Sequence, residues 1–170
     1  MRKIGRLPIG IIVGIFASFF LAWGFSAWAD FSDMITTLQT SPSTGLYRWI
    51  GKAFSLDLNL IGFFSHLPSN FVGVITGLFS GNMLAWIFTG GIAACITKGT
   101  KRGIVAALLV FVIDFLIWIL FAILSGVDLL SMFSGEDLII TLGIILGGTL
   151  GSLIGGFTFG FASGPYEDII

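Results

Sequence analysis

The chain has 170 residues, of which 56% are hydrophobic and only 10% charged, and its formal net charge at pH 7 is −1. Soluble domains carry about a quarter charged residues, so the composition excludes an ordinary soluble domain, and the near-neutral charge gives no basis for binding nucleic acid. With Cys95 as the single cysteine, no intrachain disulfide can form. We therefore expect an all-α, polytopic membrane protein in which residues 1–170 form one membrane domain.

The first apolar run covers residues 7–29 and follows three basic residues, Arg2, Lys3 and Arg6. The apolar core of a cleavable signal peptide is about 7–15 residues long, which is shorter than this run. A helix of about 20 apolar residues crosses the hydrocarbon core of a bilayer. We therefore predict a retained transmembrane helix over residues 7–29.

Residues 30–70 form the longest stretch that contains polar side chains, and we expect this segment to lie outside the cytoplasm. Apolar residues recur at helical spacing over 31–38 and again over 46–54. This spacing predicts two short amphipathic helices that lie on the membrane surface or cap the helix bundle. The intervening Ser-Pro-Ser-Thr-Gly at 41–45 predicts the turn between them.

Three further apolar runs predict transmembrane helices over residues 71–96, 104–124 and 138–162. As a helix, the run 71–96 would be roughly 40 Å long, which exceeds the ~30 Å hydrocarbon core. It must therefore tilt, protrude or break, and Gly81–Asn82 is the expected place for a break. The fold class is then a bundle of four transmembrane helices with two short amphipathic helices in the 30–70 segment.

The distribution of basic residues predicts the orientation in the membrane. Three basic residues precede the first helix, and three more, Lys98, Lys101 and Arg102, lie between the second and third. The 30–70 segment carries only Arg48 and Lys52. Because basic residues favour the cytoplasmic side, we expect a multi-pass protein of the cell (plasma) membrane with its N-terminus and C-terminus both cytoplasmic.

Small residues recur every four positions in three of the four predicted helices. The fourth helix carries one row at Gly143, Gly147, Gly151 and Gly155 and a second row at Gly148, Ser152, Gly156, Gly160 and Gly164. The second helix carries Gly73, Gly77, Gly81 and Ala85, and the first carries Gly10, Gly14, Ser18, Ala22 and Ser26. In lipid, such rows let helix backbones approach closely, so we predict a glycine-packed bundle of the glycine-zipper kind.

Two rows on one helix exceed what a single neighbouring helix requires. We expect one row of the fourth helix to pack within the chain and the other to meet another subunit. In the alternative, both rows face the protein's own bundle, because small residues serve any helix contact.

Asp114 is the single acidic residue inside an apolar helix, the eleventh of the 21 residues 104–124. An ionised carboxylate near the bilayer centre costs about 2.5–3.5 kcal/mol on insertion scales, so Asp114 must be paired, hydrated or protonated. In one interpretation it is a neutral acid that hydrogen-bonds to polar groups in the membrane, of which the chain offers Asn82, Thr89, Thr149 and Ser152. In the other, Asp114 and Asn82 mark an ion-binding or partner-binding site.

The sequence contains no catalytic constellation, no metal-ligand pattern and no phosphate-binding loop, so we expect no enzyme, no catalytic residues, no metal and no cofactor. The preferred function is a structural or accessory subunit of a larger membrane complex. The alternative is a homo-oligomeric channel or transporter for ions, protons or small solutes that uses Asp114. The expected partners are the lipid bilayer and other membrane protein subunits or further copies of this chain.

Overall fold

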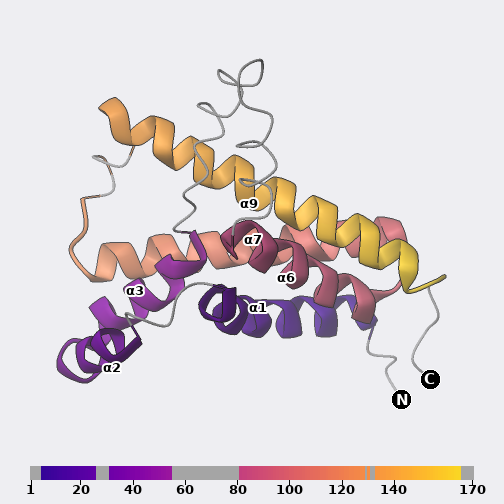
Figure 1. The fold of residues 1–170 in the computed structure, drawn as a ribbon, viewed down its shortest axis with the longest axis horizontal. Coiled ribbons are helices and arrows are strands. Elements are labelled where there is room, and N and C mark those ends of the chain that lie inside the picture. The colour runs from indigo at the N-terminus through magenta and orange to yellow at the C-terminus, as the bar shows by residue number, and fades with distance from the viewer. Residues whose placement is uncertain (1–4, 26–30, 55–80, 129, 131–132, 166–170) are drawn as a thin grey trace.

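The structure, a computed structural model, describes residues 5–25, 31–54, 81–128, 130 and 133–165. These residues form helices and no strand, so the all-α prediction is confirmed. In chain order the helices are α1 (Arg6–Phe25), α2 (Phe31–Thr40), α3 (Pro42–Phe54), α6 (Gly81–Thr97), α7 (Thr100–Leu124) and α9 (Gly135–Ala162), as Figure 1 shows.

Three of these helices are long and apolar enough to cross a membrane: α1, α7 and the part of α9 over Thr141–Ala162. Their positions agree with the predicted spans 7–29, 104–124 and 138–162. The end of α9 at Ala162 coincides with the predicted end, and Gly164 follows it with a positive φ of 79°. A left-handed residue just past a helix end is where glycine is favoured.

The predicted span 71–96 corresponds in part to α6, which has 17 residues and begins at Gly81. At 1.5 Å per residue α6 is about 26 Å long, a little shorter than the ~30 Å hydrocarbon core. Residues 71–80 lie outside the described part of the chain, so the expected break at Gly81–Asn82 stays a prediction.

The link between α6 and α7 is shorter than the sequence indicates. Residues 98–103 were expected as a basic loop, but α7 already begins at Thr100. Only Lys98 and Gly99 separate the helices, and both have a positive φ, 52° and 83°. Two successive residues with positive φ reverse the chain direction within this short link, so the remaining residues of the expected loop extend α7.

The two short amphipathic helices are present as α2 and α3, but the turn between them is a single residue, Ser41. The expected five-residue turn is wrong because Pro42 takes the first helical position, where its missing N–H and fixed φ are favourable. Gly45 then lies against α2, since a Cβ atom there would come 2.5 Å from the Leu38 Cα atom. The two helices therefore form a tight hairpin.

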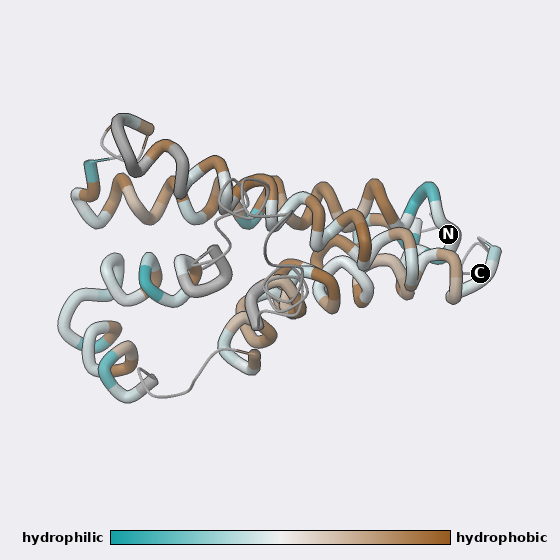
Figure 2. Tube along the Cα trace, turned by 45° about the horizontal axis from the view of Figure 1, so that its top comes forward, coloured by the Kyte–Doolittle hydropathy of each residue, from teal (hydrophilic) through white to brown (hydrophobic). Residues whose placement is uncertain are grey.

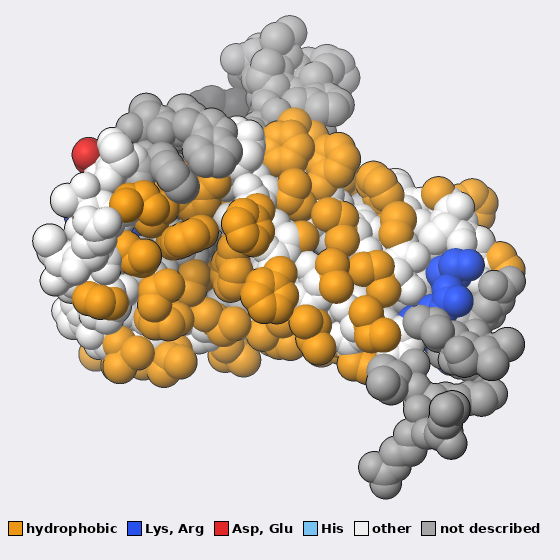
Figure 3. All heavy atoms as spheres, turned by 90° about the horizontal axis from the view of Figure 1, so that it is seen from below, with side chains coloured by type: hydrophobic (Ala, Val, Ile, Leu, Met, Phe, Trp, Pro, Cys, Tyr) orange, Lys and Arg blue, Asp and Glu red, His pale blue; other side chains and the backbone are white. Residues whose placement is uncertain are grey.

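The start of α1, the α6–α7 link and the end of α9 share one end of the bundle, on the right in Figure 1. Gly10 of α1 lies against Thr97, and Gly160 of α9 lies against Thr100. We call this end the link end. The exposed basic residues Lys101 and Arg102 lie at this end, and Figure 3 shows basic side chains gathered at one end of the molecule.

Hydrophobic residues occur along the whole length of the long helices (Figure 2), and apolar side chains cover much of the face of the bundle seen in Figure 3. Large exposed residues occur on each of the three long helices; examples are Phe16, Phe20, Leu116, Leu120, Phe157 and Phe161. A water-soluble protein rarely exposes so large a continuous apolar area. The outward faces of these helices are therefore suited to contact with lipid.

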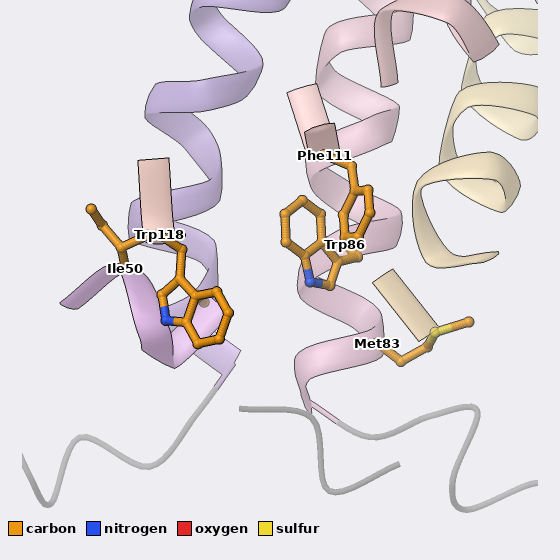
Figure 4. Close-up of a cluster of buried hydrophobic side chains, with 6 residues drawn as sticks. Ile50, Met83, Trp86, Phe111 and Trp118 are labelled. Carbon is orange, nitrogen blue, oxygen red and sulfur yellow. The ribbon is translucent and has the colours of Figure 1, made fainter. Parts of the chain in front are cut away.

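The interior has two parts of different character. Near the link end, small residues such as Ala93 and Ala106 pack with Val110. Farther from it, a cluster of larger side chains joins four helices: Ala22, Ile50, Met83, Trp86, Phe111 and Trp118. Figure 4 shows the Trp86 ring facing the Phe111 ring, edge to face with centroids 5.1 Å apart.

Candidate functional site

Two glycines of the first α9 row, Gly151 and Gly155, lie against α6. A Cβ atom at Gly151 would lie 2.8 Å from the Trp86 Cβ atom. A Cβ atom at Gly155 would collide with the Ile87 carbonyl oxygen and lie 2.9 Å from the Gly91 nitrogen. Since the α6 backbone occupies that space, the two helices approach more closely here than a larger residue would permit.

The second α9 row lies against α7. A Cβ atom at Gly148 would collide with the Phe111 ring, and one at Gly156 would lie 3.0 Å from the Gly103 carbonyl oxygen. At Gly160 the added atom would lie 3.5 Å from the Gly103 Cα atom. Glycines on both helices therefore face each other at the α7–α9 contact.

Both α9 rows are thus buried inside the single chain, over Gly143, Gly147, Gly148, Gly151, Gly155, Gly156 and Gly160. At these positions the structure favours the alternative, in which both rows face the protein's own bundle, and a contact of one row with another subunit stays a prediction. The reason is that α9 lies between two neighbours: Gly151 and Gly155 lie against α6, and Gly148, Gly156 and Gly160 lie against α7. Gly164 lies beyond the end of α9.

The small-residue row of α1 lies between α6 and α7. A Cβ atom at Gly10 would lie 2.8 Å from the Ala93 carbonyl oxygen and 2.6 Å from Thr97 Cγ2. One at Gly14 would lie 2.6 Å from Val110 Cγ2. In the second predicted helix, Gly73 and Gly77 lie outside the described residues, and Gly81 is the first residue of α6.

Asp114 occupies the centre of the bundle. It is the fifteenth of the 25 residues of α7 and is 0% exposed. Buried residues one turn away on either side, Val110 and Trp118, belong to the two parts of the core. Within the described part of the chain, neither carboxyl oxygen has a hydrogen-bond partner.

Of the polar groups expected around Asp114, those whose side chains the structure describes form no hydrogen bond with it. The Thr149 hydroxyl donates to its own backbone, to the Ile145 carbonyl oxygen at 2.7 Å. Thr89 and Ser152 are fully buried but form no hydrogen bond with the carboxyl group. Asn82 is the second residue of α6, and its side chain lies outside the described residues.

The side chain that does lie beside Asp114 is Ser18 of α1, which the sequence did not single out as its neighbour. Its hydroxyl is close to the carboxyl group but not in hydrogen-bonding geometry with it. The Ser18 hydrogen instead goes to the Ile15 carbonyl oxygen, 2.7 Å away. Gly14 packs against Val110, and one turn further along both helices Ser18 meets Asp114. The α1 row includes Ser18, but its spacing does not indicate which residue Ser18 meets.

The helix α3 closes the bundle on the aromatic side of the core. Tyr47 stacks on Trp118 with ring centroids 6.1 Å apart, and the Trp49 indole N–H donates to the Phe19 carbonyl oxygen at 3.3 Å. Burial in this contact raises the pKa of the Tyr47 hydroxyl above its ordinary value. Of the two arrangements expected for the amphipathic helices, α3 therefore has the bundle-capping one.

The described residues contain no group of three His, Cys, Asp or Glu side chains that could hold a metal ion. The buried polar side chains of the described interior are the Asp114 carboxyl group and the hydroxyls of Ser18, Thr89, Thr97, Thr141 and Ser152. No protein-family model matches the chain, and comparisons with curated proteins and with solved structures give no match.

Proposed function

We propose that the chain is a four-span protein of the plasma membrane with both termini in the cytoplasm. Three apolar helices support membrane insertion, and α6 packs among them with its two-residue link to α7. The basic residues Lys101 and Arg102 lie at the link end together with the start of α1 and the end of α9, which supports placing that end in the cytoplasm. The remaining span of the four, which is the second in chain order, then comprises α6 and the residues before it.

The proposed function is that of a structural or accessory subunit in a larger membrane complex, with glycine-zipper contacts holding its own helices together. The observation that carries this proposal is the close backbone contact between α6, α7 and α9. A Cβ atom at Gly90 would lie 2.8 Å from the Ser152 carbonyl oxygen, and those at Gly155 and Gly156 would meet α6 and α7 backbone. Helices in such contact leave no room for a solute path between them.

The partner surface in this proposal is the α2–α3 hairpin and the apolar outer faces, since the glycine rows are occupied. The hairpin lies beside the end of α7, at the end of the bundle opposite the link end (Figure 1). The face of α2 that points outward is polar, with Ser32, Asp33, Thr36 and Gln39 exposed. A partner would meet this hairpin outside the lipid, and other membrane subunits or a second copy would meet the apolar faces within it.

The mass of the intact assembly tests the subunit proposal. We expect the protein, purified in mild detergent with lipid retained, to have the mass of a complex with another membrane protein at fixed stoichiometry. Purification through a tag on that partner must return the same mass. A stable monomer would refute the subunit proposal, and a symmetric assembly of this chain alone would favour the alternative function, a homo-oligomeric channel or transporter.

The orientation is tested by accessibility of single cysteines in a Cys95→Ser background. We expect a membrane-impermeant maleimide applied to intact cells to label Gln39→Cys in α2 and to leave Lys101→Cys in α7 unlabelled. Both positions are exposed in the structure, so both must react after the membrane is permeabilised. The reverse pattern in intact cells would place the termini outside.

A further inference from the structure

We infer that Asp114 is a proton-binding site in the middle of the bundle, where a neutral carboxyl group turns toward the neighbouring Ser18 hydroxyl oxygen, donates its hydrogen bond to it and thereby joins α7 to α1. This inference goes beyond the subunit role and does not depend on it. It follows from the burial of the carboxyl group and from the direction of the hydrogen bonds around it.

The first step is the burial of an unsatisfied acid. Asp114 is 0% exposed, and neither of its oxygens accepts a hydrogen bond within the described part of the chain. A buried carboxylate is stable only when it is paired with a positive charge or accepts hydrogen bonds. A buried carboxylic acid needs only one acceptor for its own hydrogen, which is a much smaller requirement.

The second step is the direction of the Ser18 hydrogen bond. A serine hydroxyl has one hydrogen to donate and two lone pairs that accept. The Ser18 hydrogen is directed to the Ile15 carbonyl oxygen at 2.7 Å, so this hydroxyl has no hydrogen left for a carboxylate. Its oxygen still accepts, and the carboxyl group of Asp114 lies beside it. A proton on Asp114 would complete a chain from Asp114 to Ser18 to the Ile15 carbonyl.

The third step concerns the charged and titratable groups on the helices around Asp114. In α1 the ionisable side chain is Arg6 at the link end, and in α7 they are Lys101 and Arg102 at the same end. On α6, Cys95 is exposed, and on α3, Tyr47 stacks on Trp118, while Arg48 and Asp33 lie exposed on the hairpin. Lys52 also belongs to α3, and its side chain lies outside the described residues. Glu136 and Asp137 are in the first turn of α9. None of the groups whose side chains are described supplies a positive charge to Asp114.

Infrared spectroscopy of the full-length protein in lipid nanodiscs tests this inference without any assay of activity. Protonated carboxyl groups have a carbonyl-stretch band well separated from carboxylate bands. At neutral pH we expect this band in the wild type, its loss in Asp114→Asn, and no change in the matched control Asp33→Asn, whose carboxyl group is exposed. In Ser18→Ala the band should remain but move to higher frequency, because the acid loses its acceptor.

Two further measurements keep the test decisive if Asp114→Asn fails to fold. In the wild type, aspartate labelled with carbon-13 at the side-chain carboxyl must shift the band. Lack of the protonated-carboxyl band at neutral pH would overturn the proton site. Carboxylate bands that respond to added sodium or potassium ions would also overturn it, because they would show that Asp114 binds a metal cation. An unchanged band in Ser18→Ala would overturn the assigned acceptor.

Discussion

Gly155→Leu is expected to separate α9 from α6 and to destabilise the folded bundle by about 3 kcal/mol or more, the upper range for overpacking. At Gly155 an added Cβ atom would collide with the Ile87 carbonyl oxygen and approach the Gly91 nitrogen. Backbone atoms in the middle of a helix cannot turn aside as a flexible side chain does. The strain must therefore be relieved by moving whole helices apart, which also weakens the contact at Gly151.

The measurement is the thermal unfolding midpoint in mild detergent, followed by size-exclusion chromatography of the heated sample. Gly155→Ala should lower the midpoint less than leucine, because it adds only the Cβ atom. The control is Gly24→Leu on α1, where nothing lies within 4 Å of an added Cβ atom. Equal midpoints for Gly155→Leu and Gly24→Leu would show that α6 and α9 are not in the contact described.

Trp86→Ala is expected to cost about 2–3 kcal/mol of stability. Trp86 is 1% exposed and lies between α7, through Phe111, and α9, through Gly151. Truncating a buried Trp in a soluble protein costs roughly 3–5 kcal/mol, which includes the transfer from water and the cavity left behind. Between membrane helices the transfer part is largely absent, because lipid is as apolar as the core, and the cavity part remains.

Thermal unfolding checks this prediction against Phe16→Ala, which removes a large aromatic side chain that is 62% exposed on the outer face of α1. The outer-face variant should change the stability by less than about 0.5 kcal/mol, as is usual for surface substitutions. If Phe16→Ala is as costly as Trp86→Ala, the outer face of α1 is a protein contact rather than a lipid contact.

The existence and type of the described helices follow from apolar length and helical spacing alone, and α1, α7 and α9 lie close to their predicted ranges. The errors are at helix ends. Lysine rarely adopts a positive φ, so the sequence does not indicate that Lys98 and Gly99 alone form the α6–α7 link. We expected Pro42 to be part of a turn, although proline is also well tolerated in the first turn of a helix.

The sequence predicts Asp114 as a candidate site residue, but it does not predict which side chains surround Asp114 in the bundle. An acid inside an apolar helix identifies Asp114 without further information. Its neighbour Ser18 depends on which helices touch and in which register, and the periodicity of one helix carries no record of that. The same limit applies to the α9 rows: their spacing indicates close helix contact but not whether the neighbouring helix belongs to the same chain.

The two-residue link between α6 and α7 has a consequence for how the chain assembles in the membrane. Two residues span at most roughly 7 Å, so α6 and α7 enter the membrane as a helical hairpin. The two helices of this hairpin cannot diffuse apart. Their mutual docking carries almost no loop-closure entropy, and the first contact beyond the link joins Ala94 to Gly103. We expect this hairpin to form early in assembly, with α1, which is synthesised before it, and α9, which is synthesised after it, both packing against it.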